Sequence, residues 1–327
     1  KKAIAVTTTK QVESAREAYR PVATRGSLVY FLIDVMSVID HMYQYSLSAF
    51  TFFFQKALNK APPADALGAR CESLLDSVTF GSFAYVTRGL FERHRLIFSL
   101  QLACRQLVQA GKLAPELIEH LVRGPRIPSE NPIAAWLADQ AWQSVCALAQ
   151  LESFTSLPGD VEGQQKRWKE WYDLAQPETE TLPGEWKRLG GFERLLVIRA
   201  LRPDRTTLAV AMWVRDVLGA KYAEAIPFDL PLSFEDAGPA TPIFFLLSPG
   251  VAVPMETLNS MGAPLGKTED NGTFVAVSLG QGQEPVAEKA LEVGASVGGW
   301  VLLQNIELVA SWLPKLEKKL EALVEGA

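Results

Sequence analysis

The sequence predicts a mixed fold: an α-helical region over the first two-thirds of the chain, followed by a parallel α/β sheet of the P-loop type. Two observations lead to this prediction. Up to about residue 238, apolar residues recur at intervals of three and four, the period of helices that pack on one face. After Pro239, short apolar runs alternate with helical patterns, which is typical of parallel strands joined by crossover helices.

The composition is that of a folded protein with packed cores. Of the 327 residues, 48% are hydrophobic and 21% are charged, and this length allows two or more domains. A net charge of −5 argues against nucleic acid as a partner, because phosphate neutralisation needs clustered lysine and arginine. Three widely separated cysteines without CxxC spacing favour reduced thiols over disulfides or a zinc site.

The sequence predicts no membrane span and indicates a piece of a larger protein. The longest apolar stretches, at residues 28–33 and 46–54, are too short to cross a bilayer core of about 30 Å. The chain begins Lys-Lys-Ala, without methionine or a signal peptide. We therefore expect that it was cut from a longer chain and that a membrane is not a partner.

Residues 1–125 are assigned to a first helical domain. The helical pattern runs from about Gln11 to Gly111, and Pro62-Pro63 separates a first group of helices from a further stretch at residues 74–107. Residues 124–132 are rich in proline and turn-forming residues, so they are the best candidate for a boundary between helical units. We place the division near residue 125.

Residues 126–238 are expected to form a second helical domain. Tryptophans spread over it are expected to anchor packing, with each indole N–H bound to one acceptor. Residues 157–163, which are polar and contain glycine and proline, are expected to break the helices. A second break is expected at residues 201–205, because Pro203 cannot continue the preceding helix. The tryptophans are Trp136, Trp142, Trp168, Trp171 and Trp186.

Residues 239–327 are expected to form a degenerate P-loop α/β core, one half of a doubly wound sheet. The order of strand, helix, strand, helix, strand, helix implies parallel strands joined by right-handed crossovers. Strands are expected at residues 243–247, 273–279 and 300–303, and helices at residues 255–261, 285–297 and 308–324.

The loop after the first expected strand lacks the residues that bind phosphate. A P-loop needs G-x-x-x-x-G-K-[ST], because backbone N–H groups cradle the phosphates while the lysine and the hydroxyl hold the outer phosphates and magnesium. This Walker A position is occupied by Ser248, Pro249 and Gly250, with no lysine nearby. A similar sequence ends in Lys267 and Thr268, but it has one residue too few between its glycines and follows a helix.

The third expected strand ends in Gln304 and Asn305, where an ATPase would carry carboxylates to hold magnesium and to polarise a water molecule. Amides have no charge for the metal and cannot take a proton at neutral pH. The turn before Pro285 resembles half of a dinucleotide-binding loop, but Pro285 replaces its third glycine, so we interpret it as a tight turn at a helix start. We therefore predict no catalytic residue, no intact nucleotide-binding site and no metal site at this degenerate Walker B position.

The histidines do not offer an alternative chemistry. His41, His94 and His120 are far apart in the sequence and lie in helical patterns. Neither a metal cluster nor a Ser/His/Asp site is expected from them.

Seven segments resemble the motor region of dynein heavy chains, and they run in the same order over almost the whole chain. Two of them are Thr241-Pro-Ile-Phe-Phe-Leu-Leu-Ser-Pro-Gly250 and Gly299-Trp-Val-Leu-Leu-Gln-Asn305. The sequence at residues 248–250, 281–284 and 303–306 is most similar to that of axonemal outer-arm chains. The other segments are residues 17–30, 42–47, 89–92, 192–205 and 278–283.

The resemblance implies where the chain lies in a ring of six AAA+ modules. Residues 1–125 would be the end of the fifth module with its strut and connection, residues 126–238 the helical part leading into the sixth module, and residues 239–327 the core of the sixth module. In this family the first module performs the main hydrolysis and the sixth is structural. The segment is therefore expected to transmit conformational change around the ring without catalysis and without a cofactor of its own.

The resemblance also implies properties of the parent protein. The parent would be an ATPase motor that uses ATP and magnesium, contains a coiled-coil stalk and moves toward the minus ends of microtubules. It would lie in the cytoplasm and cytoskeleton, in the axoneme of a cilium or flagellum. Its implied partners are the other modules of the same heavy chain, microtubules, dynein intermediate and light chains, and other outer-arm heavy chains.

Two alternatives stay open for the segment itself. One is a cryptic nucleotide hydrolase that uses Lys267 and Thr268. The other is a site that holds nucleotide without hydrolysing it.

Overall fold

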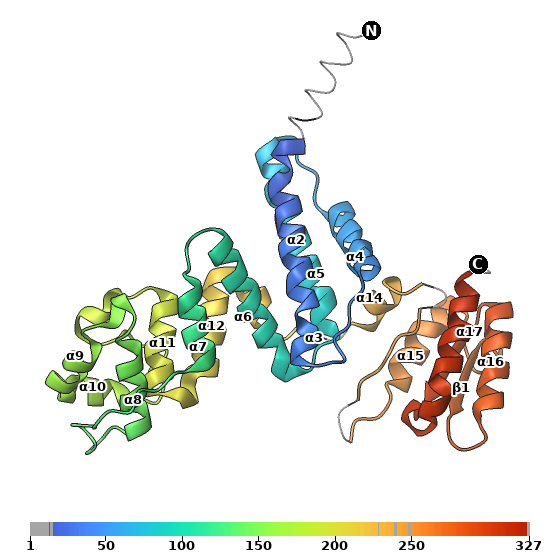
Figure 1. The fold of residues 1–327 in the computed structure, drawn as a ribbon. Helices are drawn as coiled ribbons and strands as arrows, with labels where there is room; N and C mark the ends of the chain where they lie inside the picture. The colour runs from blue at the N-terminus through green and yellow to red at the C-terminus, as the bar shows by residue number, and fades with distance from the viewer. Residues whose placement is uncertain (1–12, 14–15, 228, 239–240, 248–249, 326–327) are drawn as a thin grey trace, which may run out of the picture. The chain divides into compact units, whose positions relative to one another are not determined.

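The computed structural model describes residues 13, 16–227, 229–238, 241–247 and 250–325. The chain divides into two compact units, which we call unit 1 (Lys1–Ile226) and unit 2 (Pro227–Ala327) (Figure 1). The boundary expected near residue 125 lies inside unit 1, and the one expected after residue 238 lies inside unit 2. The predicted mixed fold is confirmed, because unit 1 is helical and unit 2 contains a parallel sheet.

The first part of unit 1 is a group of helices in which α2, α4 and α5 pack side by side (Figure 1). Ser46 caps α4 by accepting a hydrogen bond from the N–H of Ala49 at 3.1 Å. Pro62-Pro63 lies between α4 and α5, as predicted. The α4–α5 contact is close, since a Cβ on Gly81 would lie 3.1 Å from the side chain of Ala57. The helices are α2 (Arg20–Asp34), α3 (Met36–Ile39), α4 (Leu47–Lys60), α5 (Leu67–Arg88) and α6 (Glu92–Gln109).

Among the described residues, one segment, residues 20–39, is long and apolar enough to cross a membrane, with a mean hydropathy of 1.5. The expectation that the apolar stretches are too short was therefore wrong for this segment, which spans the two consecutive helices α2 and α3. A core helix of a soluble protein has the same properties, and Leu32, Ile33 and Met36 of this segment are buried in the main core of unit 1. The absence of a membrane partner stays a prediction.

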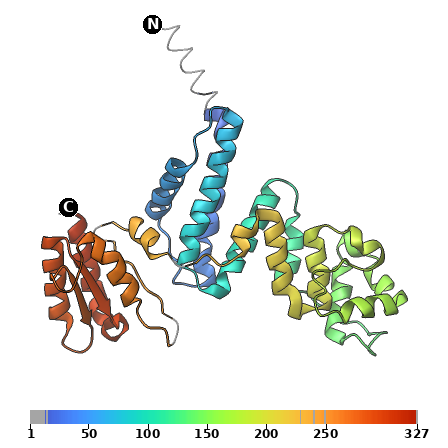
Figure 2. The ribbon, with the colours of Figure 1, turned by 180° about the vertical axis from the view of Figure 1, so that it is seen from behind.

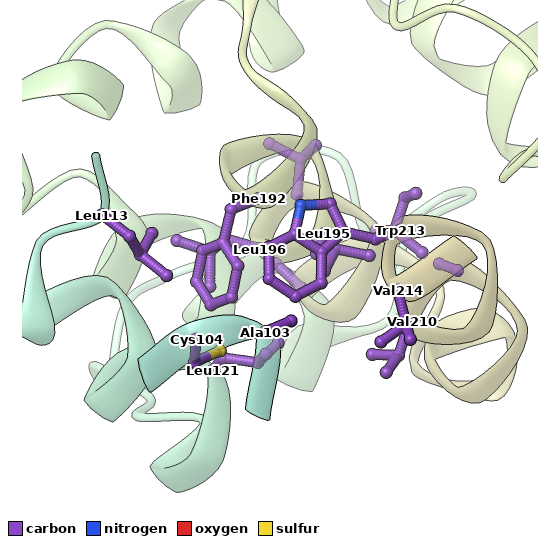
Figure 3. Close-up of a cluster of buried hydrophobic side chains, with 14 of the residues drawn as sticks. Ala103, Cys104, Leu113, Leu121, Phe192, Leu195, Leu196, Val210, Trp213 and Val214 are labelled. Atoms are coloured by element: carbon purple, nitrogen blue, oxygen red, sulfur yellow. The ribbon is translucent and has the colours of Figure 1, made fainter. Parts of the chain in front are cut away.

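The rest of unit 1 shares one hydrophobic core with α6. Figure 3 shows Phe192, Leu195 and Leu196 of α11 close to Trp213 of α12 and to Cys104 of α6. The proline-rich segment near residue 125 does not separate compact units, because α11 packs against helices on both sides of it in the sequence. The elements are α7 (Pro115–Arg123), α8 (Asp139–Leu148), η1 (Glu152–Phe154), α9 (Leu157–Gly163), α10 (Gln165–Tyr172), η2 (Gly184–Arg188), α11 (Gly191–Leu201), η3 (Pro203–Arg205), α12 (Thr206–Leu218) and α13 (Ala220–Ala223).

Residues 157–163 form helix α9, so the break expected there was wrong. Pro158 lies in the first turn, where a missing N–H costs no helical hydrogen bond. Asp160 of α9 accepts hydrogen bonds from the indole N–H groups of both Trp168 and Trp186, each at 2.9 Å. These two tryptophans are buried, as is expected of packing anchors. The buried indole N–H groups of Trp136, Trp142 and Trp171 have no acceptor among the described residues, so the expectation of one acceptor for each indole was wrong for these three. The break predicted at residues 201–205 is confirmed, because α11 ends at Leu201.

Unit 2 contains two parallel strands, β1 (Phe274–Ser278) and β2 (Trp300–Gln304), joined by α16 (Glu284–Val297). Val277 packs toward α16 and α17, whereas Phe274 packs toward α14 and α15, so helices cover both faces of the pair. Both views of the ribbon show α15, α16 and α17 next to the strands (Figure 1 and Figure 2). The remaining elements are α14 (Leu230–Glu235), α15 (Met255–Gly262), η4 (Ala263–Leu265), η5 (Ile306–Trp312) and α17 (Leu313–Glu325).

The strand expected at residues 243–247 is not formed. A strand exists only where a neighbouring backbone pairs with its N–H and C=O groups, and the sheet within the described residues contains β1 and β2 alone. The side chains of Phe244 and Leu246 are 67% and 57% exposed, so the apolar run lacks the burial that its sequence predicts. The two other expected strands are confirmed.

Candidate functional site

The candidate site lies at the carboxyl ends of β1 and β2, where ligands bind in open α/β sheets. Because the strands are parallel and in register, Ser278 and Gln304 end them side by side. The Nδ2 atom of Asn305 donates to the Ser278 hydroxyl at 3.0 Å, and the N–H of Leu279 donates to the Gln304 carbonyl oxygen at 2.9 Å. Neutral groups that bind one another therefore join the two strand ends.

The turn that follows β1 leads directly into α16. The N–H of Gln283 donates to the Gly280 carbonyl oxygen at 3.1 Å, and Gly282 has a φ of +83°, which glycine adopts at no steric cost. Glu284 and Pro285 occupy the first turn of α16. An acid and a residue without N–H at this helix start oppose the binding of a phosphate, which needs free N–H donors. The interpretation of Pro285 as a helix start is confirmed.

The predicted Walker A position is only partly described. Ser248 and Pro249 lie outside the described residues, and Gly250 is exposed with a φ of +83°. The described residues contain no group of three or more histidine, cysteine, aspartate or glutamate side chains that could hold a metal ion. The donor set at Gln304 and Asn305 therefore does not fit a magnesium ion, which prefers carboxylates. The absence of a metal in the whole chain stays a prediction.

Lys267 and Thr268 lie at the opposite, amino-terminal edge of the strands. The Nζ atom of Lys267 donates to the carbonyl oxygen of Gly298 at 2.5 Å, just before β2. The backbone of Thr268 binds Thr273 and Phe274, just before and at the start of β1. The structure thus separates this lysine and threonine from Gln304 and Asn305 by the length of the strands.

The sequence after Lys267 does not form the helix that a P-loop requires. Gly266 has a φ of +68° and caps the C-terminal end of η4, and the N–H of Lys267 donates to the Gly262 carbonyl oxygen at 2.9 Å. This is the geometry of a helix end, with carbonyl groups pointing outward. Helix ends of this kind repel phosphate, which binds at helix starts.

Two of the three histidines, His94 in α6 and His120 in α7, are partly buried and take part in ordinary packing. The Nδ1 atom of His94 lies 2.7 Å from the hydroxyl oxygen of Tyr43, and the Nε atom of Arg93 donates to Nε2 of His94 at 3.0 Å. Burial and the nearby Arg199 lower the pKa of His120. His41 is exposed in a turn rather than in a helix.

Unit 1 contains a group of paired charged residues that the sequence pattern does not indicate. Glu178 is the one buried acidic side chain among the described residues, and both of its carboxylate oxygens bind the guanidinium group of Arg205. Hydrogen bonds from Arg205 lower the pKa of Glu178. Arg202 binds both carboxylate oxygens of Asp204, at 2.9 and 2.8 Å. In the sequence, residues 201–205 show only the pattern of a helix end at Pro203.

Comparison with known proteins identifies the family. The "Dynein beta chain, flagellar outer arm" of Chlamydomonas reinhardtii is 46% identical over 97% of this chain. The human "Dynein axonemal heavy chain 9" is 45% identical over the same share. The chain belongs to the dynein heavy chain family. Residues 238–327 also match the family model for the dynein heavy chain region D6 P-loop domain.

The dynein relatives are much longer than this chain, which spans 7% of the length of each. Identity is lower, at 37%, to the "Dynein-1-beta heavy chain, flagellar inner arm I1 complex" of Chlamydomonas reinhardtii. The higher identity to an outer-arm chain agrees with the predicted outer-arm resemblance. The names of these dyneins also agree with the predicted location in the cytoskeleton of the cilium or flagellum, the axoneme.

Proposed function

We propose that this chain is a non-catalytic structural segment of the AAA+ ring of an axonemal dynein heavy chain, where it transmits conformational change around the ring. The parent protein would be the ATP-driven, minus-end-directed microtubule motor of cilia and flagella, with ATP and magnesium bound by other modules. Its proposed partners are microtubules, intermediate and light chains, and other outer-arm heavy chains. The direct partners of this segment would be the neighbouring modules of the same chain.

The observation that carries the proposal is the chemistry at the carboxyl ends of β1 and β2. Ser278 and Asn305 are hydrogen-bonded to each other, and Gln304 stands where an acid would be needed. Among the described residues, neither strand ends in a carboxylate that could hold magnesium or accept a proton from water. Lys267 cannot supply a positive charge for phosphates at these strand ends, because it is bound at the opposite edge of the strands.

Transmission of conformational change is supported by the packing of unit 1. One continuous hydrophobic core connects α2 at its beginning with α13 near its end. Close-packed cores resist continuous deformation, so helices joined in this way move as rigid bodies. A displacement applied to one end of such a unit would therefore reach the other end.

Equilibrium binding of labelled ATP with magnesium to the 327-residue chain tests the proposal. We expect no saturable binding up to millimolar nucleotide. Saturable binding that is lost in Lys267→Ala, and kept in the control Lys289→Ala, would overturn the proposal in favour of the cryptic hydrolase. Lys289 is a suitable control because it is an exposed lysine of α16.

Thermal unfolding with and without magnesium ADP tests the second alternative, a site that holds nucleotide without hydrolysis. A ligand at 100 times its Kd stabilises a protein by about 2.7 kcal/mol. For a chain of this size, that stabilisation raises Tm by several degrees, since each kcal/mol is worth about 2–4 °C. We expect no shift at 5 mM ADP, and a reproducible rise in Tm would contradict the non-binding site proposed here.

A further inference from the structure

Arginines on α11 and on the turn that follows it donate hydrogen bonds to the carbonyl ends of two other helices. The Nη2 atom of Arg199 donates to the carbonyl oxygen of Val122, in the last turn of α7, at 3.3 Å. The Nη1 atom of Arg202 donates to the carbonyl oxygen of Tyr172, the last residue of α10, at 2.5 Å, and to that of Leu174 at 3.1 Å. One short segment of the chain therefore binds two helix ends that are far apart in the sequence.

These contacts place positively charged guanidinium groups against the partly negative carbonyl ends of helices. The last carbonyl groups of a helix have no partner within the helix, and the macrodipole places about half a negative charge there. A guanidinium group is the best-suited cap, because it is always charged and presents several N–H donors in a fixed plane. The ends of α7 and α10 receive this cap from Arg199 and Arg202.

Residues 173–183, which connect α10 with η2, are held by the same group. Arg205 binds the buried carboxylate of Glu178, and the Nη2 atom of Arg194 donates to the carbonyl oxygens of Glu178, at 2.6 Å, and Glu180. Glu178 is only 5% exposed, so water cannot readily replace Arg205 as its partner. Removing one member of a buried pair leaves the other charge without compensation.

The end of α7 is shaped to admit Arg199. Gly124 follows the helix with a φ of +54°, and a Cβ at this position would overlap the guanidinium group of Arg199. The absence of a side chain at Gly124 thus serves both the left-handed backbone and the approach of the arginine. Two residues 75 positions apart in the numbering are therefore fitted to each other.

We propose that Arg199, Arg202 and Arg205 form a shared electrostatic clamp, which fastens the ends of α7 and α10 and residues 173–183 to α11. The fastened elements move as one rigid body. The segment 199–205 then connects these helices rigidly. The apolar pattern of its sequence does not indicate this role. Its role in passing conformational change onward depends on the proposed function, whereas the clamp itself does not.

Hydrogen–deuterium exchange of the 327-residue chain tests the clamp. In Arg205→Gln and in Arg202→Gln, we expect amide protection in residues 173–183 to fall at least about tenfold, as for loss of a hydrogen bond to a charged group. Protection in α4 and α5, which do not touch the clamp, should stay within about twofold of the unchanged chain. The matched control is Arg188→Gln, because Arg188 forms an exposed ion pair with Glu185 and should change nothing.

Two results would overturn the clamp: unchanged protection of residues 173–183 in both variants, or an equal loss of protection throughout unit 1. If Arg205→Gln does not fold, Arg205→Lys and Arg202→Gln decide by the same criteria, since lysine keeps the charge and loses the two-point contact. The measurement contains no nucleotide. Binding of ATP would therefore refute the proposed function and leave the clamp intact, and normal exchange would refute the clamp alone.

Discussion

Replacing Asp160 by alanine should destabilise unit 1 by about 3 kcal/mol, because one carboxylate serves two buried indoles. The Nε1 atoms of Trp168 and Trp186 each donate to the Oδ2 atom of Asp160 at 2.9 Å, and Trp168 is fully buried. A hydrogen bond to a charged group contributes about 1.5–3 kcal/mol, so two of them set an upper range of about 3–6 kcal/mol. Asp160 is half-buried, and this reduces the expected loss to the lower end of that range.

Urea unfolding followed by tryptophan fluorescence measures this loss. The signal comes mainly from unit 1, since only Trp300 and Trp312 lie in unit 2. Asp160→Asn should cost less than half as much as Asp160→Ala, because an amide oxygen still accepts a hydrogen bond. The matched control is Asp173→Ala, which removes an exposed ion pair with Lys169 and should cost less than about 0.5 kcal/mol.

A loss below about 1 kcal/mol for Asp160→Ala would refute the reasoning, because two unsatisfied buried N–H groups cannot cost so little. Equal losses for the alanine and asparagine variants would refute it as well, because the amide oxygen of asparagine should still accept a hydrogen bond from the indoles. Coupling between the sites is measured by a double-mutant cycle of Asp160→Ala with Trp186→Phe. A coupling energy near zero would show that the hydrogen bond between Asp160 and Trp186 does not stabilise unit 1.

Two further predictions use the same measurements. Gly124→Ala should lower the unfolding free energy by about 2 kcal/mol, because it strains a left-handed backbone and displaces Arg199. In a chain that also carries Arg199→Ala, the loss caused by Gly124→Ala should be smaller. Fully additive losses of the two substitutions would contradict this. Hydrogen bonds from Lys315, Trp312 and Lys319 lower the pKa of Glu288 from 4.5 to about 2. A lowered folded pKa gives stability that is present above pH 4.5 and lost as the pH falls toward 2. NMR titration should locate this pKa, and Glu288→Gln should reduce the pH dependence of unfolding in that window, while the part that comes from Glu178 remains.

The parallel strands and their crossover helix could be predicted because their pattern is local. β1 and β2 are short apolar runs on either side of a helix-length amphipathic stretch, and each has a neighbour with which to pair. Residues 243–247 have the same kind of pattern but no paired backbone. Sequence period indicates what a segment prefers, and the presence of a partner decides whether it becomes a strand.

Helix α9 and the arginine clamp show two other limits of the sequence. Pro158 and Gly159 were interpreted as breakers, although proline is favoured in a first helical turn, and the helix start could not be located by composition alone. The partner of Arg205 is 27 positions away at Glu178, in a segment without any distinguishing pattern. Contacts of this kind depend on the tertiary fold.

The neutral candidate site could be predicted more fully, because it was defined by residue types. Gln304 and Asn305 lie at the carboxyl end of β2, where the sequence placed them. The bond between Asn305 and Ser278 could not be predicted, since it needs the register of two strands. The contact of Lys267 with the Gly298 carbonyl oxygen could not be predicted either, because the two residues are 31 positions apart and meet only in the folded chain.

The backbone of Asn305 makes an acidic side chain at this position costly. Its φ of +57° belongs to a conformation that asparagine tolerates and glutamate does not favour, at a cost of about 1 kcal/mol. A mutation to glutamate would also forfeit the bond to Ser278. An Asn305→Glu variant should therefore lose stability in unit 2 through its backbone conformation as well as through the missing hydrogen bond.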